Sequence, residues 1–332
     1  MFAAIRSPRR WQLALSHIVK GALPFACAAL SPGRGLAQSG SAGAPAVGVV
    51  VVAHGGDSAW NTRVVDVVRR VRTGGPVEVS FLMGPGAPRT RFQDVVRRLE
   101  QRGVREIVVV PMLVSSHSGH YEQIRYLAGD SVRLAEAMIH HLHMAGIEKP
   151  VTRVPVRVAR ALDDAPQVAT VLAERAMTLE PDSNRRRRGA LFIVGHGPNS
   201  AEDYAAWMSN LRGVADSVRA LAGFRDVRVD LVRDDAPAAV RAEAVRRVRE
   251  LVELQRALTG DTVVVVPVLI SKGEVSRDKI PNDLRGLPIR YSGEPLLPHA
   301  ALAMWIEERV REATGTTSSN ARNASRERST RP

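Results

Sequence analysis

Cysteine is almost absent from this chain of 332 residues, since Cys27 is the only one. A single cysteine excludes disulfide bonds within the chain. Aromatic residues are also scarce, at 4% of the sequence. A buried core must therefore be built from valine, leucine, alanine and isoleucine, and this composition favours an α/β protein over an aromatic-rich binding module.

Two common catalytic motifs are missing as well. The sequence contains neither a glycine-rich phosphate loop of the Walker type nor a Gly-x-Ser-x-Gly nucleophile elbow. ATP use and serine-hydrolase chemistry are therefore disfavoured. Beyond residue 38 no apolar run reaches the length that a membrane span needs, so we expect no integral membrane segment in the mature chain.

Positive charge is abundant, with a formal net charge of +13 at pH 7. Nearly all of this excess lies in three segments: the first 38 residues, the run Arg185–Arg188 and the tail from residue 314. The basic residues are not interleaved with aromatic ones and form no recognition motif. We therefore expect no nucleic-acid partner.

The first 38 residues have the features of an export signal. They begin with basic residues, continue with an apolar stretch over Ala22–Leu30 and end with small residues at Gly35 and Ala37. We expect cleavage next to Gln38 and a periplasmic or exported protein. The alternative is a disordered basic leader on a cytoplasmic protein.

The rest of the chain contains two copies of one pattern. The segments Val49–Gly56 and Leu191–Pro198 are apolar runs that stop at a small residue, a histidine and a glycine. Later in each copy a second apolar run is broken by proline, at Ile107–Ser115 and Val263–Ser271. The matching order and similar spacing indicate an internal duplication with repeats of domain size.

Both copies alternate apolar strands with amphipathic helices, which is typical of a parallel sheet covered by helices on both faces. We therefore expect an α/β fold of two tandem, doubly wound parallel-sheet units. The expected organisation is an export signal at 1–38, a linker at 39–46, a first unit at 47–178, an arginine-rich solvated linker at 179–189, a second unit at 190–313 and a disordered basic tail at 314–332.

The strands and helices can be placed from the same pattern. In the first unit we expect strands at 47–53, 77–82, 106–114 and 151–158, with helices at 59–72, 91–101 and 163–177 and one long helix beginning near Glu122. In the second we expect strands at 190–195, 227–232, 262–270 and 288–292, with helices at 201–221, 238–258 and 299–313.

Histidines gather where two neighbouring strands of the first unit end. His54 follows the first strand, and the loop after the third strand carries His117, His120 and Glu122. The first and third strands of such a unit lie side by side, so these side chains can converge at one sheet edge. Neutral imidazoles with a nearby carboxylate suit a divalent cation such as Co²⁺, Fe²⁺, Ni²⁺ or Zn²⁺.

These motifs resemble those of the class II chelatases of the sirohydrochlorin cobaltochelatase type. The resemblance rests on the Gly-His-Gly-like turns at His54 and His196 and on the Val-Pro runs at Pro111 and Pro267, and it covers about residues 47–310. It implies two flavodoxin-like halves in the long, tandem form of the family. It also implies ATP-independent insertion of a divalent metal into sirohydrochlorin or a related tetrapyrrole, without a nucleotide cofactor.

The resemblance assigns roles to particular residues. His54 matches the first metal-binding histidine of the family. His120 matches the second if one extra residue is allowed after Pro111, and His117 is a competing assignment. In the second half Val275 stands where the family has its histidine, so His196 is left with Glu274 as its best potential partner. That half is expected to shape the cleft without running chemistry.

Metal insertion also requires a proton acceptor, because the free-base macrocycle loses two pyrrole N–H protons. Histidine can hold the metal or take a proton, and Glu122 can relay a proton to solvent. Candidate partners for the substrate carboxylates are Arg89, Arg91, Arg125 and Lys272, and candidate cleft aromatics are Trp60, Tyr121, Tyr126, Trp207 and Trp305.

A second function fits the same features. The missing histidine at Val275 and the export signal favour a non-catalytic, exported metal- or tetrapyrrole-binding protein. The choice of metal, the macrocycle and the oligomeric state are left open by the sequence.

Overall fold

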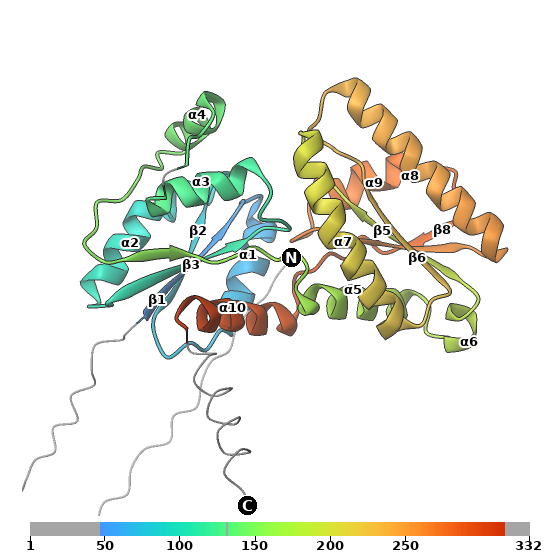
Figure 1. Ribbon diagram of the computed structural model, residues 1–332, viewed down its shortest axis with the longest axis horizontal. Helices are drawn as coiled ribbons and strands as arrows, with labels where there is room; N and C mark the ends of the chain where they lie inside the picture. The colour runs from blue at the N-terminus through green and yellow to red at the C-terminus, as the bar shows by residue number, and fades with distance from the viewer. Residues whose placement is uncertain (1–46, 131, 316–332) are drawn as a thin grey trace, which may run out of the picture. The chain divides into compact units, whose positions relative to one another are not determined.

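Two four-stranded parallel sheets, one in each half of the chain, form the framework of the protein (Figure 1). The computed structural model describes residues 47–130 and 132–315, which belong to one compact unit. The predicted export signal, the linker at 39–46 and all but the start of the basic tail lie outside the described residues. In the described part of the chain no helix is both long and apolar enough to cross a membrane.

The first sheet has the strand order β2-β1-β3-β4 with every pair parallel. In β1, Val49 and Val51 point into one apolar cluster, whereas Val50 and Val52 point into another. Since both faces of the sheet are buried, it is doubly wound as predicted. The strands are β1 (Val47–Ala53), β2 (Val77–Phe81), β3 (Glu106–Met112) and β4 (Val156–Val158).

The second sheet repeats this arrangement with the order β6-β5-β7-β8, again parallel throughout. Its central strand is wholly buried, as expected for a continuous apolar run. The strands are β5 (Ala190–Gly195), β6 (Asp226–Leu231), β7 (Val263–Pro267) and β8 (Ile289–Tyr291). The α/β fold of two tandem parallel-sheet units is therefore confirmed.

Helices connect the strands in both halves. Those of the first half are α1 (Ser58–Val68), the 3₁₀ turn η1 (Ala87–Arg89), α2 (Phe92–Gln101), α3 (Gly119–Ala128), α4 (Glu136–Met144) and α5 (Pro166–Leu179). After the short α6 (Ser183–Arg186), those of the second half are α7 (Ala201–Ala222), α8 (Ala238–Thr259), the π-helical η2 (Val275–Lys279), α9 (Ile280–Asp283) and α10 (Ala300–Ala313).

The last helix of each half packs on the other half. Helix α5 contacts β7 and α7, whereas α10 contacts β3 and α1 (Figure 1). Trp305 of α10 is completely buried, and a single apolar cluster joins Val51 of the first sheet to Ile193 of the second. This exchange of helices fastens the two sheets to each other through a shared core.

The predicted long helix is wrong, because two helices occupy that region. Helix α3 begins at Gly119, where Ser118 caps it by accepting a hydrogen bond from the Tyr121 amide. It ends where Gly129 adopts a φ of 101°, a left-handed conformation that terminates helices. A separate helix, α4, then starts at Glu136.

The arginine-rich segment after α5 is exposed to solvent along most of its length, but it also contains structure that the linker prediction did not include. It contains the short helix α6, whose N-terminus is capped by Asp182. Glu180 is buried and forms ion pairs with Arg185 at 3.2 Å and with Arg290 at 2.7 Å. The run of arginines is therefore partly used to neutralise a buried carboxylate, which the sequence pattern did not indicate.

Candidate functional site

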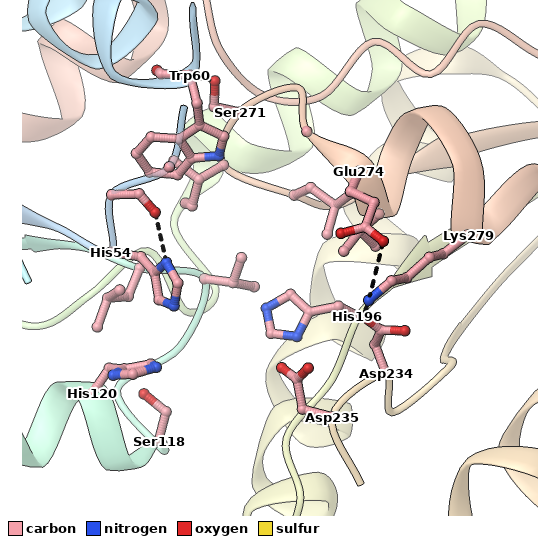
Figure 2. A pocket seen from close by; sticks show the side chains of 18 of the residues that line it. His54, Trp60, Ser118, His120, His196, Asp234, Asp235, Ser271, Glu274 and Lys279 are labelled. Atoms are coloured by element: carbon pink, nitrogen blue, oxygen red, sulfur yellow. Dashed lines mark hydrogen bonds and ion pairs between the residues drawn. The ribbon is translucent and has the colours of Figure 1, made fainter. Parts of the chain in front are cut away.

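A cavity of about 610 Å³ opens at the carboxyl ends of the strands and is lined by residues from both halves (Figure 2). This volume is within the usual range of small-molecule sites. Three histidines line it: His54 after β1, His120 in α3 and His196 after β5. The cavity therefore lies where open parallel sheets place their ligand sites.

His54 is held by the residue that follows it. Its Nδ1 lies 2.8 Å from the carbonyl oxygen of Gly55. A carbonyl oxygen only accepts hydrogen bonds, so Nδ1 carries the proton and the lone pair is on Nε2. Gly55 has a φ of +93°, and a Cβ at this position would lie 2.2 Å from the Met83 carbonyl oxygen. Glycine is thus required for the turn that orients the ring.

His196 repeats this arrangement in the second half. Its Nδ1 lies 2.8 Å from the carbonyl oxygen of Gly197, a residue with a φ of +77°. The Nε2 atom of His196 therefore also carries a free lone pair. In both halves the His-Gly sequence therefore fixes the imidazole tautomer in the same way, through a hydrogen bond to the glycine carbonyl.

His120 is fixed by a side chain instead. Its Nδ1 lies 2.9 Å from Oε1 of Gln123, and Nε2 of Gln123 donates to the Met138 carbonyl at 2.6 Å. The second bond sets the orientation of the amide, because only its nitrogen can donate to a carbonyl. The oxygen then faces His120, whose Nδ1 is protonated and whose Nε2 is free. Gln123 is 1% exposed, so this support is rigid.

The rings of His54 and His120 lie together on the first-half wall (Figure 2), with centroids 4.7 Å apart and an interplanar angle of 84°. Burial, followed by the charge on His54, lowers the pKa of His120 to about 4. His120 is therefore neutral at physiological pH and can bind a divalent cation without first losing a proton.

The other predicted residues of the first half lie elsewhere. His117 is exposed and does not line the cavity, although its carbonyl accepts a 2.6 Å hydrogen bond from Trp207 Nε1. Glu122 is also exposed and outside the cavity lining. Over the described residues, no set of three or more His, Cys, Asp or Glu side chains is arranged to hold a metal ion. A cation at His54 and His120 would thus have two protein ligands and several open positions.

The second-half wall combines His196 with acidic residues (Figure 2). Burial lowers the pKa of His196, and the charges of Asp235 and Asp234 oppose that shift. Glu274 lines the cavity, but its ion-pair partner is Lys279 at 4.0 Å and not His196. Val275 also lines the cavity. His196 is the one imidazole among the second-half residues that line it.

The basic residues of the cavity are not those that the sequence indicated. Arg91 pairs with Asp94, Arg125 with Asp130 and Lys272 with Glu294, while Arg89 borders a different pocket. The cations that line the cavity are Arg277 and Lys279. Both lie in a π-helical turn after β7, and charge alone does not single them out among the many basic residues of the sequence.

Two of the five candidate aromatic residues line the cavity: Trp60 from α1 and Trp207 from α7. Trp207 contacts the His196 ring edge-on, with centroids 5.4 Å apart. Trp305 instead belongs to the buried core. Tyr121 donates to the Ala159 carbonyl and Tyr126 lies beneath Lys149, both outside the cavity lining.

Sequence reasoning missed Gln123 and Asp235. Gln123 is three residues after His120, which places the two on one face of a helix, so its supporting role could have been found from spacing. Asp234 and Asp235 come shortly after β6, at the same sheet edge as His196. Their position at a strand end is a signal of the kind that led to His54.

Comparison with known families gives one match to the sequence: residues 48–179 match the family model CbiX. No curated protein matches the chain. Among solved structures, SirB from Bacillus subtilis with Fe³⁺ is similar, with a TM-score of 0.56 and 16% identity over 82% of this chain and 98% of that one. This likeness shows a shared fold.

Two further structures are more distant. DR2241 from Deinococcus radiodurans, described as a multi-domain protein with structural similarity to chelatases, has a TM-score of 0.48 and 20% identity over 80% of this chain and 55% of that one. CbiX, described as the terminal enzyme for biosynthesis of siroheme in denitrifying bacteria, has a TM-score of 0.44 and 17% identity over 80% of this chain and 98% of that one.

The support of His120 by Gln123 can be tested through metal binding. We expect Gln123→Met to weaken Co²⁺ binding by about 10- to 100-fold, because the ring loses the acceptor that orients it. Isothermal titration with Co²⁺ measures the affinity, and circular dichroism checks the fold. Gln93→Met is the matched control, since the Gln93 amide bonds Gly146 outside the cavity. Equal affinities in the two variants would contradict this role of Gln123.

The lowered pKa of His120 predicts a pH dependence of stability. The unfolded chain gains a proton on His120 near pH 6.5, whereas the folded chain does so only at about 4. Stability is therefore lost as the pH falls from 6.5 toward 4, by about 2 kcal/mol at pH 5. Urea unfolding of metal-free protein at pH 7 and pH 5 should show a smaller loss in His120→Gln. An unchanged loss there, equal to that of the exposed control His143→Gln, would refute the assignment.

Proposed function

We propose that the protein is a class II chelatase that inserts Co²⁺ or Fe²⁺ into sirohydrochlorin or a related tetrapyrrole without ATP, on the basis of the CbiX family match over residues 48–179 and the chelatase-like motifs of both halves. The observation that carries this proposal is the pair of adjacent imidazoles, His54 and His120, in a cavity large enough for a small molecule. The reaction class is that of a metal chelatase.

The incomplete ligand set supports transfer in preference to storage. His54 and His120 each present an Nε2 lone pair, and imidazole suits borderline divalent ions. Two protein ligands leave positions that water holds at first and that the four macrocycle nitrogens can take over. A closed set of four protein ligands would hold the metal too firmly for this exchange.

The walls of the cavity suit a flat macrocycle with acidic side groups. Trp60 of the first half offers aromatic surface to a planar ring, whereas Trp207 of the second half borders the cavity but is only 3% exposed. Arg277 is exposed and lies 3.6 Å from Asp57, so it can turn to a substrate carboxylate, whereas Lys279 is engaged by Asp234 at 2.8 Å. The acidic residues of the cavity favour entry of the metal cation. The metal and the macrocycle are both substrates, and no nucleotide takes part.

The alternative function is a non-catalytic, exported protein that binds a metal or a tetrapyrrole. Val275 favours it, because the second half lacks the histidine that would complete a second metal-binding pair. The distinguishing property is turnover: a chelatase forms metallated product in excess over protein, whereas a carrier saturates at one equivalent.

The first test is an anaerobic absorbance assay of the full chain with sirohydrochlorin and Co²⁺. We expect multiple turnovers, lost by at least about 100-fold in His54→Ala because the metal loses one of two ligands. His143→Ala, an exposed histidine of α4, is the matched control and should keep full activity. Turnover that persists in His54→Ala would rule out this site, and spectral changes that stop at one equivalent would favour the carrier.

We also propose that the protein is exported, on the strength of its basic and apolar N-terminal leader. Expression in a Gram-negative host, followed by mass spectrometry of the periplasmic fraction, should find a chain that starts at Gln38 or next to it. Full-length protein confined to the cytoplasm would argue against export.

A further inference from the structure

The second-half wall keeps a histidine that it cannot use for a two-imidazole metal site. Val275, which lines this wall, stands where the family resemblance implies a second histidine, yet His196 has the same backbone anchor as His54, with Nδ1 2.8 Å from the following glycine carbonyl. Its Nε2 lone pair is free and its ring projects into the cavity from the second half (Figure 2). The wall therefore carries an oriented base without a partner ligand.

The neighbouring carboxylates are of two kinds. Asp234 is almost buried and is neutralised by Lys279 at 2.8 Å and Arg241 at 3.4 Å. Asp235 is exposed and, among the described residues, pairs with no cation. Its carboxylate points toward His196 (Figure 2), and it is the first of the charges that act on this ring. Asp235 therefore acts electrostatically on the His196 ring and is itself in contact with solvent.

Metal insertion needs a base that is not already occupied. The lone pairs of His54 and His120 are spent on the metal, so these rings cannot take the pyrrole protons while they hold it. Glu122 lies outside the cavity lining. His196 is the third imidazole of the cavity, and Trp207 packs against its edge and limits its rotation.

We propose that His196 accepts the pyrrole protons on the wall opposite the metal-binding pair, and that Asp235 stabilises the resulting imidazolium and passes each proton to solvent. The inference rests on the proposed chelatase function and deepens it. The second half then contributes a catalytic residue to the reaction in addition to forming the cleft.

The step balances without an oxidant or reductant. Each pyrrole N–H bond breaks heterolytically, its electron pair stays on nitrogen and forms the bond to the metal, and Nε2 of His196 takes the proton. The proton leaves through Asp235 and water, and the neutral ring accepts the second one. One divalent cation thus replaces two protons.

The test compares His196→Gln and Asp235→Asn with the wild-type full chain in the Co²⁺ and sirohydrochlorin assay. Removal of a general base is expected to lower kcat by about 100-fold or more in His196→Gln, with Co²⁺ affinity and KM unchanged within about 3-fold. Asp278→Asn is the matched control for loss of an exposed carboxylate, because Asp278 does not line the cavity. It should retain wild-type kcat.

The pH profile separates proton transfer from a merely structural role. Activity requires neutral His196, so kcat falls as the pH drops through the pKa of this ring. Burial lowers that pKa and His54 adds to this effect, whereas the hydrogen bond to Gly197 and the charges of Asp235 and Asp234 raise it. Asp235→Asn should therefore shift the acid limb to lower pH and reduce kcat by about 10-fold. Asp278→Asn should leave the limb in place.

The outcomes are distinguishable. Wild-type kcat in folded His196→Gln, with activity still lost in His54→Ala, overturns the role of His196 alone. A loss of Co²⁺ affinity in His196→Gln that matches its loss of kcat makes this residue a metal ligand and also overturns the proposal. A wild-type chain that never exceeds one turnover overturns both the chelatase function and this inference.

Discussion

The packing of each half's last helix on the opposite half is the constraint on which the site depends. Helix α10 buries Trp305 against the first half, while α5 packs on β7 and α7. Because one apolar cluster is shared by both sheets, their carboxyl edges are held at one cavity. A chain whose halves packed only on themselves would leave the histidines of the two halves on independent bodies, and no ligand could bridge them.

The same backbone hydrogen bond orients the histidine ring in each half. In both halves a glycine with positive φ turns its carbonyl back onto the preceding histidine and fixes the proton on Nδ1. Duplication supplied two such histidines, and the halves then differ in what stands beside them. His54 has His120 as a neighbour, whereas His196 has acidic residues. In the proposed reaction the same ring binds the metal on one wall and takes up protons on the other.

The pattern of apolar residues along the chain predicts the strands of this protein better than it predicts its helices and loops. Continuous valine runs predicted the buried strands, and their ends predicted the place of His54. The sequence pattern predicts one long helix after β3, where the structure has two. Hydrophobic periodicity does not show that Gly129 adopts a left-handed conformation, which ends α3. The spacing after Pro111 left His117 and His120 as competitors. Ser118 separates them in the structure, since it caps α3 and so puts His120 in the first turn and His117 before it.

The sequence by itself determined the duplicated α/β architecture and the carboxyl-edge position of its histidines, because both follow from the order of apolar runs and glycines along the chain. Only the tertiary structure decided which side chains share the cavity. His120 lines it from the first half, His196 and Asp235 line it from the second, and Arg277 and Lys279 are its basic residues in place of those expected from the sequence. These residues come from segments that are distant in the chain. Neither charge nor spacing along the sequence shows which of them meet.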